Sequence, residues 1–274
     1  MNTDSGGRPG SNSSHIRTRP TSLVFGAGGL HRLAFAKRRQ ALLRQAFDLG
    51  FRSFDVAPAY GNGLNEVELG AAFSTHRGDI KITTKFGIPI ETYGERFRAS
   101  FALVRASRKY FYRGYGSEYS RRLFSGPAMV ESLHGSLRRL RCDYVDRLLI
   151  HEPLESFSSE IAIELSEFAA RLKAQGKVLS FGVCGPADSV LHAISSMPMD
   201  VVQTPLWDAV SLAQPSSQRF VAYGVYRDFR RQAGALRQEF VDYVSTLQAT
   251  RPNLELILAS VSQKTLLRWQ VLFQ

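Results

Sequence analysis

Eight short apolar runs alternate with segments of helical periodicity along this chain, and that alternation limits its fold more than any other feature. Parallel strands need a long crossover between them, so a repeated strand and helix order predicts a parallel sheet. Eight strands can close such a sheet into a barrel, which takes about 250 residues. We therefore expect one α/β domain, a (β/α)8 TIM barrel, over residues 21–274. Its strands are predicted at residues 22–27, 51–57, 80–86, 146–151, 178–184, 200–206, 220–225 and 254–260.

The helices are predicted from the apolar spacing between these strands, and two connections are irregular. Residues 209–219, between the sixth and seventh strands, include Pro215, so we expect the helix there to be absent or reduced to a turn. This gives the barrel a shortened C-terminal third. The connection after the third strand, residues 90–125, is roughly thirty residues longer than a minimal one. The helices are expected at residues 35–49, 64–74, 127–141, 158–175, 187–196 and 229–248.

The long connection has an unusual composition. Residues 92–124 contain eight Arg or Lys residues, two Glu residues and nine aromatic residues, which together supply +6 of the formal net charge of +11. Connections that follow the strands of such a barrel lie at its active-site end, so one interpretation is a lid that contacts an acidic or aromatic substrate or a partner. The other interpretation is a solvated, partly helical insertion whose aromatic side chains pack on the side of the barrel.

The two ends of the chain and its cysteines add a few expectations. Residues 1–20 are rich in Ser, Gly, Asn and Arg and lack an apolar core, so we expect a disordered tail that is neither a secretory signal nor a membrane anchor. Residues 271–274 resemble the remnant of a viral protease cleavage site and receive no weight in the fold. Cys142 and Cys184 have neither metal-ligand spacing nor a disulfide framework, which indicates structural thiols in a reducing compartment, by default the cytoplasm.

Four polar residues lie at or just after the ends of predicted strands: Asp55 and Tyr60, Lys85, and His151. The carboxyl ends of the strands of a parallel barrel meet at one rim, so these side chains can converge. A tyrosine has an unperturbed pKa of about 10, and the ammonium of Lys85 is expected to lower that pKa while Asp55 keeps the lysine charged. His151 can hydrogen-bond the oxygen that receives the proton. The pattern predicts a proton-donating active site.

Each of these residues also has an ordinary structural explanation. Asp55 can cap the turn that follows it, Tyr60 can be a packed loop aromatic, and a single histidine at a strand end such as His151 is more often structural. Lys85 is the exception, because a lysine that points into a barrel is costly to desolvate unless it is paired. The combination favours a catalytic site, and none of the other histidines that we considered has partners at the spacing of a metal site.

The motifs around these residues resemble the aldo-keto reductase family. The most specific stretch is residues 46–61 with 65–70, which is similar to the family's second strand, its catalytic Asp and Tyr, and the start of the next helix. The Gly-Asn-Gly-Leu turn at residues 61–64 is most similar to the bacterial branch that acts on aldoses and other small carbonyls. The resemblance extends from about residue 21 to 208, with further matches at residues 136–140, 143–146, 149–153 and 176–183.

This resemblance implies an enzyme, an NAD(P)H-dependent oxidoreductase that reduces an aldehyde or ketone to an alcohol, or runs the reverse reaction. Hydride transfer would be paired with proton donation by Tyr60, whose acidity Asp55 and Lys85 set, while His151 orients the carbonyl. NADP(H) is the favoured cofactor and NAD(H) the alternative. A small carbonyl compound is the expected substrate, with Trp207 in its pocket.

The resemblance also implies how the cofactor is held, and the chain departs from the family pattern in two places. Gln203 matches the residue that contacts the nicotinamide amide and Tyr223 the one that stacks on its ring, but the usual Ser-Asn pair reads Cys184-Gly185. After the eighth strand, Lys264 is the only positive charge in the segment where the family often binds the 2′-phosphate. The candidate cofactor residues are Gln203, Tyr223, Cys184, Ser260, Ser262, Lys264 and Arg227, with Arg230 and Arg231 near the last of these.

Two other functions stay open at this point. The Cys184-Gly185 departure is compatible with a nucleotide-binding module without turnover that acts as a redox sensor or scaffold. The basic, aromatic insertion and the pI of 9.9 suggest nucleic-acid binding, but no nucleic-acid motif is recognisable. We expect neither a nucleic acid nor a membrane as partner, and the sequence does not indicate an oligomeric state.

Overall fold

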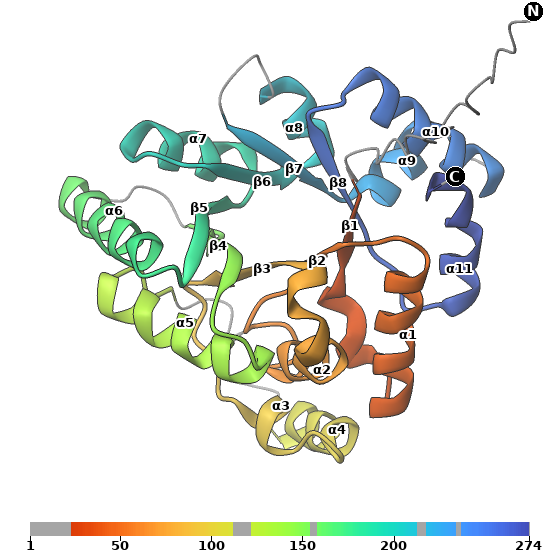
Figure 1. Cartoon of the computed structure of the whole chain (residues 1–274), viewed down its shortest axis with the longest axis horizontal. Coiled ribbons are helices and arrows are strands. Elements are labelled where there is room, and N and C mark those ends of the chain that lie inside the picture. The colour runs from red at the N-terminus through yellow and green to blue at the C-terminus, as the bar shows by residue number, and fades with distance from the viewer. Residues whose placement is uncertain (1–22, 112–121, 154–157, 213–217, 234–236, 274) are drawn as a thin grey trace, which may run out of the picture.

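The protein folds as a closed barrel of eight parallel strands, each hydrogen-bonded to its neighbours in chain order, with β8 completing the ring against β1 (Figure 1). The computed structural model describes residues 23–111, 122–153, 158–212, 218–233 and 237–273. All eight predicted strands are present, which confirms the expected TIM barrel. The strands are β1 (Leu23–Gly26), β2 (Ser53–Asp55), β3 (Lys81–Phe86), β4 (Val145–His151), β5 (Val178–Cys184), β6 (Val201–Pro205), β7 (Arg219–Tyr223) and β8 (Leu254–Leu258).

Helices surround the barrel and cover the outer faces of its strands (Figure 1). Five of them lie close to the predicted ranges: α1 (Ala36–Asp48), α2 (Leu64–Phe73), α5 (Gly126–Leu140), α6 (Ser159–Ala174) and α7 (Ala187–Ser196). The sequence did not predict α11 (Gln263–Arg268). The single helix expected at 229–248 corresponds to α9 (Val225–Ala233) and α10 (Arg237–Thr250), and residues 234–236 between them lie outside the described ranges.

The prediction for the connection after β6 was wrong. A helix, α8 (Leu206–Leu212), begins directly after Pro205 and is seven residues long. The predicted strand ran to residue 206 and the connection was counted only from residue 209, so the space for a helix was underestimated. Leu206 and Ala209 are buried three positions apart, which is the spacing of one helix face packed on the barrel.

Apolar side chains, together with the ion pair of Arg147 and Glu255 that joins β4 to β8 across the ring, fill the inside of the barrel, so the barrel is a packed core and not a pore. Alternate residues along each strand point inward and outward, which divides the buried residues into an inner and an outer cluster. The outer cluster joins the strands to the helices. The inner cluster consists of Val24, Leu149, Cys184, Val201, Val221 and Ile257, with Tyr223 packed against it.

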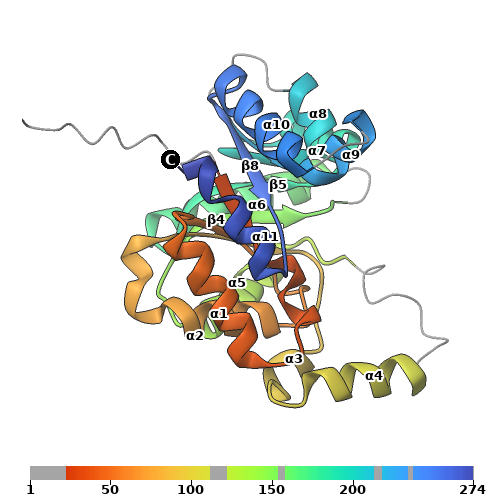
Figure 2. The same cartoon turned by 90° about the vertical axis from the view of Figure 1, so that its right-hand side faces the viewer.

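The described part of the long insertion packs against the side of the barrel. It forms α3 (Tyr93–Arg96) and α4 (Phe101–Phe111), which lie next to α1 and α2, with α4 extending away from the body (Figure 2). Phe101 is buried and stacks on Tyr93 with ring centroids 5.8 Å apart, while Arg98 binds the buried carboxylate of Glu68 at 2.7 Å. For Tyr93 and Phe101 this agrees with the second interpretation, although Phe97 is exposed. Residues 112–121 lie outside the described ranges.

The C-terminal residues take part in the core, contrary to expectation. A 3-10 turn, η4 (Gln270–Phe273), follows α11, and the ring of Phe273 packs edge-on against the fully buried Phe51 at 4.8 Å. Leu272 and Phe273 therefore pack against the outer cluster, while Val271 is exposed. The predicted N-terminal tail, residues 1–20, lies outside the described ranges. None of the described helices has the length and apolar character needed to cross a membrane.

Candidate active site

A buried ion pair forms the floor of the candidate site. Asp55 ends β2 and Lys85 is the fifth residue of the neighbouring strand β3, so both side chains reach the carboxyl rim of the barrel. The ammonium of Lys85 donates to both carboxylate oxygens of Asp55 at 2.8 Å and to the carbonyl of Val56 at 3.1 Å. Lys85 has no solvent-exposed surface. The cost of burying its charge is offset by this complete set of acceptors.

The loop after β2 places Tyr60 above this pair. The Nζ atom of Lys85 lies 5.0 Å from the centroid of the Tyr60 ring, and the positive charge of the lysine acts on the phenol. Gly28 lies beneath the ring, where an added Cβ atom would be 3.4 Å from it. The turn that follows has left-handed residues at Gly61, Asn62 and Gly63, which suits its glycine-rich sequence.

His151 ends β4 and faces Tyr60. The two rings meet edge to face with centroids 5.7 Å apart, and the imidazole is buried. Burial lowers the pKa of His151 well below 6.5, and the positive charges of Lys85 and Arg122 lower it further. The imidazole is therefore neutral at neutral pH. The structure brings together all four residues that the sequence singled out.

The expected change in the acidity of Tyr60 was wrong in sign. Burial raises the pKa of the phenol above its ordinary value, and although Lys85 lowers it, Asp55 raises it again. The main reason is the burial of the phenol, and the carboxylate of Asp55, which is paired with the ammonium, also opposes the lowering by Lys85. Desolvation also acts on Lys85 itself, but the attraction of Asp55 outweighs it and raises the pKa of the lysine, which stays charged.

Gln203 connects this cluster to the predicted nicotinamide contacts. Its Nε2 atom donates to Asp55 at 2.8 Å, while its buried Oε1 atom has no hydrogen-bond partner among the described residues. A buried acceptor without a donor is uncommon and indicates a missing group. The carboxamide of a nicotinamide carries an N–H donor of the required kind. The residues present therefore fit that cofactor at this point.

Two further predicted contacts lie on the adjoining strands. Cys184 ends β5 and is in register with both His151 and Gln203. Burial raises the pKa of its thiol to about 12, so it stays protonated. Tyr223 ends β7, is half-buried and packs against the inner cluster of the barrel. Both residues occupy the rim where the resemblance places the nicotinamide.

The residues predicted for the 2′-phosphate and the substrate pocket lie on several different elements, α8, α9, α11 and the segment before α11. Ser260 is half-buried and accepts from the backbone N–H of Ser262 at 3.0 Å, while Ser262 caps α11. Lys264 and Arg227 are exposed, on α11 and α9 respectively. Trp207, at the start of α8, is half-buried. Arg231, which the sequence offered as a phosphate ligand, instead lies over the indole ring of Trp207, with its Cζ atom 4.7 Å from the ring centroid.

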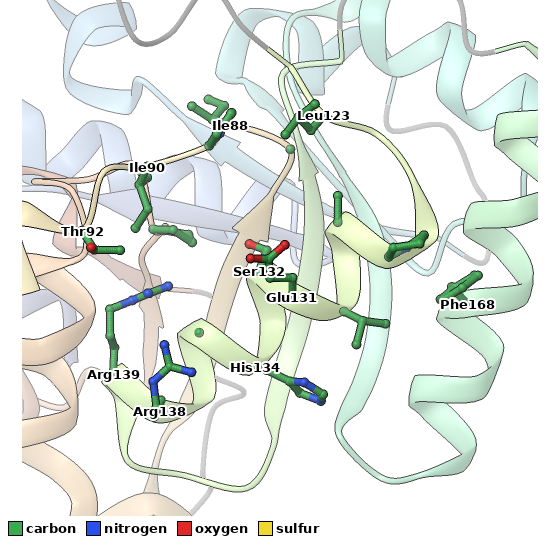
Figure 3. Close-up of a pocket in the computed structure, with 17 residues that line it drawn as sticks. Ile88, Ile90, Thr92, Leu123, Glu131, Ser132, His134, Arg138, Arg139 and Phe168 are labelled. Atoms are coloured by element: carbon green, nitrogen blue, oxygen red, sulfur yellow. The ribbon is translucent and has the colours of Figure 1, made fainter.

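A cavity of about 780 Å³ lies on the outside of the barrel, between α5, α6 and the segment after β3 (Figure 3). Ile88, Ile90, Leu123 and Phe168 give it apolar walls, and His134, Arg138 and Arg139 project from α5. None of the four candidate catalytic residues lines it. The candidate site is therefore identified by its chemistry at the barrel rim and not by the size of a hollow.

The sequence did not single out two residues of the rim, Arg122 and Glu152. Arg122 was counted only as part of the insertion's charge, and Glu152 only as a neighbour of His151 in a matching motif. Their side chains form an ion pair at 3.2 Å beside the imidazole. No periodicity predicts this contact, because it joins two irregular segments that follow different strands.

Comparisons with known proteins agree with the fold and identify the family. Residues 22–212 match the model of the aldo/keto reductase family. The chain is 29% identical to L-galactose dehydrogenase of Arabidopsis thaliana over 59% of its length and 43% of that protein's, and 30% identical to D-threo-aldose 1-dehydrogenase of a Pseudomonas species over 66% and 55%. The chain thus spans about half the length of these relatives. A crystal structure of an aldo-keto reductase from Klebsiella pneumoniae in complex with NADPH superposes with a TM-score of 0.64 at 18% identity, covering 92% of this chain and 85% of that one, which shows a shared fold.

Proposed function

The chain belongs to the aldo/keto reductase family, and we propose that it is an oxidoreductase that reduces an aldehyde or ketone to an alcohol, or catalyses the reverse, with a nicotinamide dinucleotide. The observation that carries this proposal is the cluster of Tyr60, Lys85, Asp55 and His151 at one rim of the barrel. Bacterial relatives of the chain include an aldose dehydrogenase. This supports a small hydroxylated carbonyl compound as the substrate class.

Each residue of the cluster has a separate role in the proposed reaction. A bound reduced nicotinamide would supply the hydride that the carbonyl carbon receives. As the π electrons of the C=O bond move to oxygen, the hydroxyl of Tyr60 donates its proton to that oxygen. The phenolate that remains is stabilised by the ammonium of Lys85 and takes its next proton from water. The neutral imidazole of His151 donates an N–H hydrogen bond to the same carbonyl oxygen and fixes its direction.

The contacts of the cofactor are part of the proposal. Gln203 would accept from the nicotinamide carboxamide through its unpartnered Oε1 atom, and Tyr223 would stack on the ring. Cys184 replaces a polar family residue at the same rim. Ser260, Ser262, Lys264 and Arg227 are the candidates for the adenosine end. NADP(H) is favoured, because one solved structure of the same fold is described with NADPH and the chain is strongly basic.

The experiment that tests this function is the oxidation of NADPH or NADH in the presence of a panel of small aldehydes and aldoses, followed by absorbance. Replacing Tyr60 by Phe keeps the ring and removes the proton. We expect Tyr60→Phe to lower turnover by about 10²–10⁴-fold while the dissociation constant for NADPH, measured by fluorescence, stays within about twofold of that of the unmodified protein. Full turnover in this variant would exclude Tyr60 as the acid. Binding of NADPH or NADH without its oxidation in the presence of any panel member would instead support a module without turnover.

A further inference from the structure

Arg122 reaches from the end of the insertion to the rim of the candidate site. Its guanidinium side chain is only 8% exposed, although it belongs to an irregular segment. The Nε atom donates to the backbone carbonyl of Glu152 at 3.1 Å, and Nη2 donates to the carboxylate of the same residue at 3.2 Å. One arginine therefore holds both the main chain and the side chain of the residue that directly follows His151.

Glu152 has an unusual backbone conformation that needs such support. Its φ angle is +47°, in the left-handed region that non-glycine residues rarely adopt. Its N–H donates to the carbonyl of Cys184 at 2.7 Å, so three hydrogen bonds fix this residue. Strain of this kind persists only where the surroundings impose it, and it concentrates beside functional residues.

We propose that Arg122 is a positioning residue: its two contacts with Glu152 hold that residue in the left-handed conformation and thereby fix the imidazole of His151 opposite Tyr60. This inference rests on the proposed function and adds to it, because it gives a residue of the insertion a role in positioning one of the four candidate catalytic residues. The contact between Arg122 and Glu152 joins the segment after β3 to the loop after β4 at the rim.

The charges around His151 give the contact a second consequence. Two cations act on the imidazole, and each of them is paired with a carboxylate. Without the guanidinium, the imidazole loses a neighbouring positive charge and gains an unpaired carboxylate nearby, and both changes raise its pKa. The titratable and charged groups concerned are Lys85 with Asp55, Arg122 with Glu152, and the uncharged Tyr60, Cys184 and Tyr223.

The test uses the full chain with Arg122→Gln, Arg122→Lys and, as a matched loss of charge at an exposed position, Arg138→Gln. We expect Arg122→Gln to lower kcat by about tenfold or more, with the KM for NADPH nearly unchanged. Arg122→Lys keeps the charge but cannot bridge both groups of Glu152, so it is expected to lower kcat as well. Arg138→Gln should behave as the unmodified protein. Unchanged kcat in either Arg122 variant overturns the proposal.

A rescue variant separates positioning from general damage. Glycine adopts the left-handed conformation without strain, so Glu152→Gly in the Arg122→Gln background should restore at least about threefold of the lost kcat. A double variant as slow as Arg122→Gln overturns the proposal. Thermal unfolding of each variant checks that the comparison is made between folded proteins.

A readout without turnover keeps this inference separate from the proposed function. The His151 C2 proton, assigned by its absence in the spectrum of His151→Gln, should titrate at a lower pH in the unmodified protein than in Arg122→Gln, because the guanidinium is one of the groups that lower the pKa of the imidazole. Equal behaviour of this resonance in both proteins counts against the inference even when no substrate is found. Failure of the function itself appears differently, as an unmodified protein that reduces no carbonyl or a Tyr60→Phe variant that still does.

Discussion

Replacing Asp55 and Lys85, singly and together, measures the interaction energy between the two side chains. The Nζ atom lies 2.8 Å from both carboxylate oxygens, and the two side chains are 0% and 8% exposed. Two unit charges at this distance attract by about 6 kcal/mol at an effective dielectric constant of about 20. Removing two such ions from water costs several kcal/mol for each. The pair therefore contributes little net stability, but either charge alone is costly.

Each single substitution leaves a buried charge without its counter-ion. Lys85→Met and Asp55→Asn are each expected to lower the free energy of unfolding by about 3–5 kcal/mol, or the melting temperature by about 6–20 °C. The double variant carries no charge at this point and should recover most of that loss. The resulting coupling energy is expected to be at least about 4 kcal/mol, because the two single losses together far exceed the loss in the double variant.

The assay is denaturant unfolding of the four proteins at neutral pH without nucleotide. Desolvation lowers the pKa of Lys85, but Asp55 raises it more, and the net pKa is above the unfolded value. The stabilisation by the charged lysine is thus fully present below its unfolded pKa and is lost only as the pH rises through the folded one. Lys173→Met is the control, because Lys173 and Asp200 form an equally short but exposed pair whose loss should cost less than about 1 kcal/mol. Additive effects of the two buried substitutions, with coupling below about 0.5 kcal/mol, would refute the reasoning.

Two predictions concern neighbouring residues. The pKa of His151 is held well below 6.5, mainly by burial, so below about pH 6.5 the unfolded chain binds a proton that the folded chain does not. The free energy of unfolding should therefore fall by about 1.4 kcal/mol per pH unit below about pH 6.5. This contribution should disappear in His151→Gln, and identical pH profiles of stability in the two proteins would contradict the prediction. Gln203→Leu removes the proposed acceptor for the nicotinamide carboxamide and should weaken NADPH binding up to about tenfold in a fluorescence titration. Thr204→Val, at the next position of β6, should leave the affinity unchanged. Equal affinities in the two variants would exclude the contact between Gln203 and the carboxamide.

The positions of Asp55, Lys85 and His151 at one rim can be predicted from the sequence. Each follows an apolar run of strand length, and the carboxyl ends of parallel strands must share one edge. The closed barrel follows from the same runs, because eight of them alternate with helical segments and the chain has the length of one domain. Strong periodic patterns are thus sufficient for the fold and for the floor of the site.

Contacts made by irregular segments cannot be predicted from periodic sequence patterns. Phe273 packs on Phe51 although residues 271–274 resemble part of a protease cleavage site, because removing a large apolar ring from water is favourable. The contact between Arg122 and Glu152 requires a left-handed backbone at residue 152. Neither residue type nor spacing indicates that conformation, since it is imposed by hydrogen bonds from other segments.

The acidity of Tyr60 shows why a motif fixes the residues of a site but not their protonation. The sequence pairs a phenol with a lysine, which suggests a lowered pKa, yet burial and the nearby carboxylate raise it. In the proposed reaction this is an advantage, because a donor must keep its proton until the carbonyl oxygen becomes an alkoxide. An alkoxide is a much stronger base than a phenolate, so Tyr60 needs no lowered pKa in the resting state to give up its proton. The ammonium of Lys85, which lies 5.0 Å from the centroid of the Tyr60 ring, acts afterwards, when the phenolate forms. This order explains why Asp55 can be paired with the charged lysine without removing its role.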